Sequence, residues 1–160
     1  MYQHILVPLD GSALSETVLS HAQPLAQKLG ATLLLLRVAD VSATIMAATG
    51  PDTGMVAPDL IDEVIDDQEE DGRAYLERLS QQVKGAGSQV SWQLVEGSPA
   101  QSIIETARKS NCDLIAMATH GRSGLERAVL GSVADAVVRE SHLPVLLIRP
   151  FAKRAPGGGS

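Results

Sequence analysis

Residues 114–132 read LIAMATHGRSGLERAVLGS, and this stretch decides the fold. The apolar run Leu114 to Ala118 is typical of a buried strand, and a segment rich in glycine and hydroxyl residues follows it and leads into a helix. Glycines let a backbone approach an anion closely, and the first N–H groups of a helix have no intrahelical partner. The stretch therefore predicts a strand and a helix joined by a loop of the kind that holds phosphate in α/β proteins.

The same alternation runs through the rest of the chain. Aliphatic runs predict further strands over residues 5–7, 32–38 and 144–148, and alternation predicts an edge strand over residues 89–95. Apolar residues at helical spacing predict a helix between successive strands. One helix per strand favours a parallel sheet with helices on both faces. The loops at residues 8–12, 38–41 and 118–132 then emerge at one edge of the sheet, where ligands of such folds bind.

Local signals predict where the helices begin and end. Ser12 is an expected N-cap and Gly30 an expected helix end, with a kink at Pro24 because proline removes a backbone donor. Ser98 to Gln101 has the residues of a capping box. We expect a long loop over residues 39–58, which are small, polar and turn-rich, and an amphipathic helix from Asp59 to the glycines at 85–87.

Composition limits the function classes. A chain of 160 residues fits one domain, and its net charge of −6 with 2% aromatic residues argues against nucleic acid as a partner. No apolar run approaches the length of a membrane span, and the N-terminus lacks a signal-peptide pattern. The single Cys112 excludes an internal disulfide. We therefore expect a cytoplasmic protein with no membrane partner.

Few side chains suggest chemistry of their own. Asp10 is able to accept bonds from a ribose or an adenine amine, or to cap the local backbone, and both roles are compatible. His120 could act as a general base, but it is interpreted as a positioning or backbone-bonding residue, because no nucleophile or orienting acid lies near it in sequence. The eight acids between Asp59 and Asp71 are interpreted as an exposed helix face without metal-ligand spacing. No catalytic and no metal-binding residue is predicted.

The chain resembles the universal stress protein family. The resemblance extends from about Tyr2 to Pro150, and it is carried by these segments: HILVPLDGS (4–12), RVAD (37–40), EGSP (96–99), CDLIAM (112–117), THGRSG (119–124), LGSV (130–133) and PVLLIR (144–149). It implies a domain over residues 1–150 followed by a flexible tail over 151–160. We predict a doubly wound, Rossmann-like five-stranded parallel sheet with strand order 3-2-1-4-5.

The resemblance also implies a nucleotide site. ATP-binding members carry Gly-x2-Gly-x9-Gly-Ser/Thr, which aligns here with Ala118, Gly121, Gly131 and Ser132, so alanine replaces the first glycine. The family pattern places residues 8, 10 and 38 around adenine and ribose, residue 118 near the ribose, and residues 121, 122 and 131–134 near the phosphates. The predicted nucleotide-binding residues are Pro8, Leu9, Asp10, Val38, Met117, Ala118, His120, Gly121, Arg122, Gly131, Ser132, Val133 and Ala134.

Three functions follow from this comparison. The first is an adenine-nucleotide-binding regulator of the stress response, binding ATP or another adenine nucleotide with or without Mg²⁺, that switches a dimer or partner surface with little or no hydrolysis. The second is a slow Mg²⁺-dependent ATPase or phosphotransferase. The third is an interaction module that no longer binds nucleotide, which the methyl group of Ala118 favours by adding bulk and disfavouring positive φ. The resemblance implies a homodimer through the last strand, Val145 to Arg149, and an unidentified protein partner.

Overall fold

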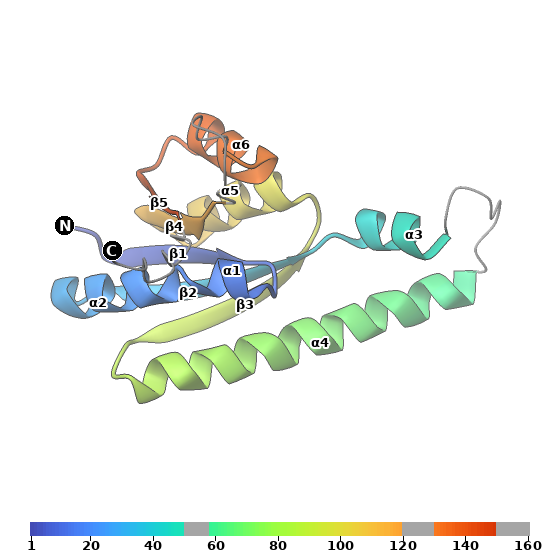
Figure 1. Cartoon of the computed structure of the whole chain (residues 1–160), viewed down its shortest axis with the longest axis horizontal. Coiled ribbons are helices and arrows are strands. Elements are labelled where there is room, and N and C mark those ends of the chain that lie inside the picture. The colour runs from blue at the N-terminus through green and yellow to red at the C-terminus, as the bar shows by residue number, and fades with distance from the viewer. Residues whose placement is uncertain (50–57, 120–129, 150–160) are drawn as a thin grey trace, which may run out of the picture.

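The computed structural model describes residues 1–49, 58–119 and 130–149, in which strands and helices alternate (Figure 1). The strands are β1 (His4–Leu9), β2 (Thr32–Ala39), β3 (Val90–Glu96), β4 (Leu114–Ala118) and β5 (Val145–Ile148). The helices are α1 (Ala13–Glu16), α2 (Leu19–Leu29), α3 (Val41–Thr49), α4 (Pro58–Gly85), α5 (Pro99–Lys109) and α6 (Ser132–Glu140).

The five strands form one parallel sheet in the order β3-β2-β1-β4-β5, which confirms the predicted fold class. The chain moves outward from β1 through β2 to β3, then returns to pair β4 with the other side of β1. The strand order therefore reverses between β1 and β4. In open α/β sheets, ligands bind beyond the carboxyl ends of the strands at such a switch point.

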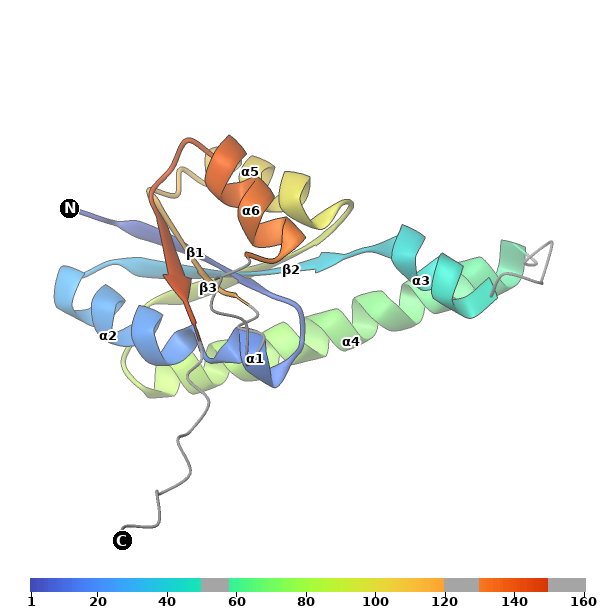
Figure 2. The same cartoon turned by 45° about the horizontal axis from the view of Figure 1, so that its top comes forward.

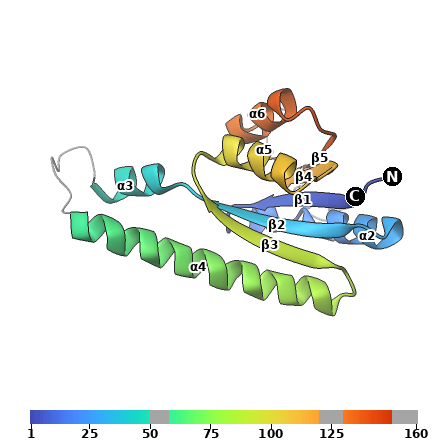
Figure 3. The same cartoon turned by 180° about the vertical axis from the view of Figure 1, so that it is seen from behind.

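Helices cover both faces of the sheet, α2 and α4 on one face and α5 and α6 on the other (Figures 1 and 3). Successive side chains of a strand point to opposite faces. In β1, Ile5 and Val7 are fully buried under α2 and α4, while Leu6 is fully buried under α5 and α6. This two-sided burial explains why β1, β2 and β4 are largely continuous aliphatic runs, whereas the edge strand β3 alternates.

The first predicted helix is interrupted, although not at Pro24. Ser12 caps α1 as predicted, since its Oγ accepts a hydrogen bond of 3.1 Å from the backbone N of Ser15. The backbone N and the hydroxyl of Thr17 both donate to Leu14 O, which closes α1 after about one turn. α2 then begins at Leu19 and contains an exposed Pro24 within its length. Short-range hydroxyl bonding, rather than the proline, sets the break.

The capping box predicted at α5 is only partly formed. Ser98 is the N-cap and Pro99 stands in the first turn, as expected. The Ser98 side chain makes no capping hydrogen bond, and Gln101 Nε2 donates instead to Glu105 Oε1 over 3.2 Å. A carboxylate one turn further along is a stronger acceptor for the amide than a backbone group.

Residues 41–49, predicted as part of a loop, form helix α3, so that prediction was wrong. Asp40 caps the helix: its Oδ1 accepts from Ala43 N over 3.1 Å, and its backbone O accepts from Thr44 N over 3.2 Å. Alanine, the best helix former, recurs in the segment. Gly50, Pro51 and Gly54, the turn residues behind the loop prediction, lie outside the described residues.

α3 and the first half of α4 extend together beyond the sheet (Figures 1 and 2). We call α3 and residues 58–71 of α4 the arm. Half-buried residues recur at helical spacing along both helices, and Gln68 Nε2 donates a hydrogen bond to Thr44 Oγ1 between them. No helix in residues 1–49, 58–119 and 130–149 combines the length and the apolar character needed to cross a membrane.

Candidate functional site

A pocket of about 360 Å³ opens at the carboxyl edge of β1, β2 and β4, on the face covered by α5 and α6. It lies at the switch point between β1 and β4. The residues around it are Pro8, Leu9, Asp10, Ser15, Leu36, Val38, Pro99, Ile103, Met117, Ala118, Thr119, Gly131, Ser132, Val133 and Ala134.

The pocket brings the predicted site residues together. Every predicted residue within the described ranges lines it: Pro8, Leu9, Asp10, Val38, Met117, Ala118, Gly131, Ser132, Val133 and Ala134. The first and last of these residues, Pro8 and Ala134, are more than 120 positions apart in the sequence. The predicted residues His120, Gly121 and Arg122 lie outside the described residues. That the assembled residues bind a nucleotide stays a prediction.

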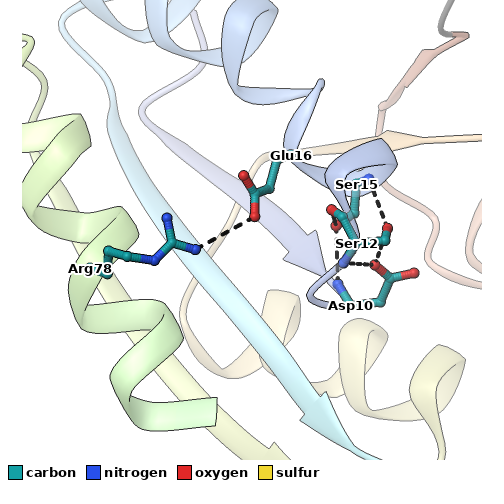
Figure 4. A network of polar contacts seen from close by, with 5 residues as sticks. All are labelled: Asp10, Ser12, Ser15, Glu16 and Arg78. Atoms are coloured by element: carbon teal, nitrogen blue, oxygen red, sulfur yellow. Dashed lines mark hydrogen bonds and ion pairs between the residues drawn. The ribbon is translucent and has the colours of Figure 1, made fainter. Parts of the chain in front are cut away.

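Asp10 lines this pocket from the turn after β1. Figure 4 shows the hydrogen bonds within that turn. Asp10 Oδ1 accepts hydrogen bonds from Ser12 N at 2.9 Å and from Ser12 Oγ at 2.5 Å. Asp10 N donates to Ser15 Oγ at 3.3 Å, and Ser15 Oγ donates to Ser12 O at 2.9 Å. The sequence left two roles open for Asp10, and the structure shows that the local role exists while the same carboxyl group borders the pocket.

The start of α6 also lines the pocket. Gly131 is the N-cap, with φ −60° and ψ 157°, and Ser132, Val133 and Ala134 form the first turn. A Cβ added to Gly131 would meet no other heavy atom within 4 Å, so packing in the described part of the chain does not require glycine here. First-turn N–H groups have no intrahelical acceptor and lie at the positive end of the helix dipole. This side of the pocket suits an anion.

Ala118 ends β4 and is half-buried at the pocket. Its methyl group was expected to oppose a backbone of positive φ. Among the described non-glycine residues, only Asn111 and His142 have positive φ, so Ala118 has an ordinary strand conformation. The alanine therefore adds a methyl group to the pocket wall without straining the backbone.

Sequence reasoning missed five lining residues: Ser15, Leu36, Pro99, Ile103 and Thr119. Leu36 was detectable, because it lies two positions before Val38 and so points to the same face of β2. Pro99 and Ile103 lie in the first turns of α5, one helical turn apart. Their place at the pocket depends on how α5 crosses the sheet, which the sequence pattern does not specify.

The lining of the pocket divides into apolar and polar side chains. Leu36, Val38 and Ile103 supply aliphatic surface. The polar side chains of the described lining are the carboxylate of Asp10 and the hydroxyls of Ser15, Thr119 and Ser132. A flat apolar group with a polar, anionic extension matches this division. A second, polar cavity of about 540 Å³ lies beside the ends of β2 and β3, lined by Asp40, Val41, Ser42, Glu96, Gly97 and Ser98.

Comparison with known proteins agrees with this architecture. Residues 1–149 match the model of the universal stress protein family. This chain belongs to that family. Universal stress protein MJ0531 of Methanocaldococcus jannaschii is 35% identical over 152 residues, which cover 93% of this chain and 83% of that protein.

Solved structures of universal stress proteins show the same fold. The structure of MJ0577 of Methanocaldococcus jannaschii superimposes with a TM-score of 0.76 at 26% identity, covering 94% of this chain and 98% of that one. A universal stress protein in complex with cAMP superimposes with a TM-score of 0.64 at 24% identity, covering 92% and 97%. The family thus includes a solved member with an adenine nucleotide bound.

Proposed function

We propose that this universal stress protein is a cytoplasmic regulatory protein that binds ATP or another adenine nucleotide, with or without Mg²⁺, and hydrolyses it little or not at all. The observation that carries the proposal is the pocket itself. It combines aliphatic side chains, Asp10 and the N-terminus of α6 at the switch point of the sheet. The cAMP complex of a relative supports the same class of ligand.

Each part of the ligand has matching residues in the described lining. Adenine would lie against Leu36, Val38 and Ile103, where burial of its faces is favourable. Asp10 would accept a hydrogen bond from a ribose hydroxyl. The first-turn N–H groups of α6 and the Ser132 hydroxyl would hold phosphate oxygens, as helix N-termini do in other nucleotide sites.

Calorimetric titration of the purified protein with ATP, ADP, AMP and cAMP tests the proposal. Ser132→Glu places a carboxylate on an exposed residue at the phosphate end, and we expect it to weaken ATP binding by at least about tenfold through charge repulsion. Val138→Glu is the matched control, because Val138 is exposed further along the same helix and does not line the pocket. Millimolar or weaker binding of all four nucleotides would rule out the proposal.

We propose further that the nucleotide acts on a homodimer formed through β5. β5 is an edge strand, and in the described part of the chain it pairs with β4 alone. Val145, Leu146 and Leu147 are half-buried on it, and an unpaired apolar edge favours pairing with a second chain. Sedimentation with and without ATP measures this association. A monomer under both conditions would exclude the dimer and leave the nucleotide proposal standing.

A further inference from the structure

Arg37 lies directly behind the pocket. It stands in β2 beside Leu9 of β1, and its neighbours Leu36 and Val38 both line the pocket. Because side chains alternate along a strand, Arg37 points to the opposite face of the sheet, towards α4. It is half-buried there, although a charged group buried at a sheet face loses hydration. The presence of a long, charged side chain at this half-buried position therefore needs an explanation.

The guanidinium group of Arg37 packs against the turn that carries Asp10. A Cβ added to Gly11 would lie 2.5 Å from Arg37 Nη1, 3.2 Å from Cζ and 3.3 Å from Nη2. A side chain at residue 11 would therefore overlap Nη1, and it would leave Cζ and Nη2 in tight contact unless the guanidinium moved. Gly11 also has φ +86°, which favours glycine. The shape of the turn and the position of the guanidinium are thus fitted to each other.

Helix α4 holds the other side of the guanidinium group. Arg37 Cζ lies 5.0 Å from the centroid of the Tyr75 ring, which is cation–π distance. Gly72, one turn earlier, lies beside the Arg37 stem, since an added Cβ would be in ordinary contact with Arg37 Cδ at 3.6 Å; its closer neighbour is Leu94 Cδ1 of β3 at 2.9 Å. Burial, together with the neighbouring Glu16 carboxylate, raises the pKa of Tyr75 to about 12, so the ring stays neutral.

We propose that Arg37 is a positioning residue for the nucleotide site: from the opposite face of the sheet, it holds the Asp10-Gly11-Ser12 turn in the shape that presents Asp10 to the pocket. This inference rests on the proposed function. The planar guanidinium group packs between the Tyr75 ring and the turn. Lysine keeps the charge but has no plane to lie against the Gly11 backbone, so it is a poor replacement.

Arg78 provides a matched control. Its Cζ lies 5.4 Å from the centroid of the same Tyr75 ring, and its Nη2 lies 3.8 Å from Glu16 Oε1 of α1 (Figure 4). It therefore shares the chemistry and the neighbourhood of Arg37. It differs in its relation to the turn, because the three atoms nearest to a Cβ built at Gly11 all belong to Arg37.

The experiment compares ATP affinity in Arg37→Met, Arg37→Lys, Arg78→Met, Asp10→Asn and the double variant Asp10→Asn/Arg37→Met. We expect Arg37→Met to weaken binding by about tenfold, the worth of one hydrogen bond to a charged group, and Arg37→Lys to recover only part of the loss. Arg78→Met should bind as the parent protein does. In the double variant, loss of Arg37 should cost nothing beyond the Asp10→Asn loss, because Arg37 acts through Asp10.

A structural role alone would give a different result. If Arg37 only packs against α4, Arg37→Met lowers the melting temperature but leaves the affinity unchanged, and that overturns the inference. Additive losses in the double variant overturn it too, since Arg37 would then act independently of Asp10. Amide resonances of Gly11 and Ser12 in the nucleotide-free protein give a separate readout. If the parent binds no nucleotide, the proposed function fails, and unchanged resonances in Arg37→Met would show that Arg37 does not shape the turn either.

Discussion

The two halves of α4 have the same secondary structure but opposite surroundings. The helix has 28 residues and is about 42 Å long at the usual rise per residue. Its second half packs on the sheet, where Leu76, Leu79 and Val83 are at most 2% exposed. Its first half lies in the arm beside α3, and Leu60 there is 54% exposed. Burial against the sheet stabilises the second half, whereas the first half relies on α3 and on its own local interactions.

The largest predicted effect tests this difference directly. Leu76→Ala should lower the free energy of unfolding by about 2–5 kcal/mol, because it removes buried surface and leaves a cavity under the sheet. Leu60→Ala, the same change in the arm, should stay within about 0.5 kcal/mol. Urea denaturation of both variants measures the two values. A large cost at Leu60 would mean that the arm is covered by another surface in solution.

The same contrast explains what the sequence could predict. The strands and the packed helices were predictable because burial on two faces leaves aliphatic runs, as in residues 32–38, and burial on one face leaves a helical period. α3 was missed because its sequence has no such period, and it depends on Asp40 for a cap and on α4 for a partner. Ten of the fifteen residues that line the pocket were predictable from the family motifs, and five were missed. The packing of Arg37 against Gly11 could not be predicted, because the two residues belong to separate segments that come together only in the folded sheet.

A smaller effect is expected from charge in the arm. Asp66 is exposed and has acids at all four neighbouring helix positions, namely Asp62, Glu63, Glu69 and Glu70. Like charges at these spacings destabilise a helix by about 0.2–0.5 kcal/mol per pair. Asp66→Lys reverses each pair, so it should slow amide hydrogen exchange across residues 59–71, and salt should weaken the gain.

A matched substitution in the packed half of α4 should have the opposite effect on amide hydrogen exchange. Glu77 is exposed there, and Arg73 lies four residues before it. Glu77→Lys replaces an attractive pair by a repulsive one, so exchange should become slightly faster around residue 77. If Asp66→Lys also speeds exchange, electrostatic repulsion does not limit the stability of the arm.

The smallest effect is expected at the base of the arm, where α4 meets the end of β3. A hydrogen bond with Glu69, then loss of hydration, then the charge of Glu69 raise the pKa of Glu96 above its ordinary value of 4.5. A carboxyl group whose pKa is raised by folding stabilises the protein when protonated, and this contribution disappears as pH rises through the raised pKa. At neutral pH the two carboxylates repel each other.

Glu96→Gln should therefore raise the melting temperature at neutral pH, because a neutral amide replaces one of the two charges. The gain over the parent should shrink as pH falls through the raised pKa of Glu96, because the parent regains its proton there. Glu105→Gln is the control with the opposite sign, since the Gln101 amide and the Lys109 charge lower the pKa of Glu105. Glu105→Gln should lower the melting temperature at neutral pH, and this difference from the parent should vanish in acid. If both variants change the melting temperature in the same direction at neutral pH, Glu69 and Glu96 do not share a proton, and charge repulsion does not destabilise the base of the arm.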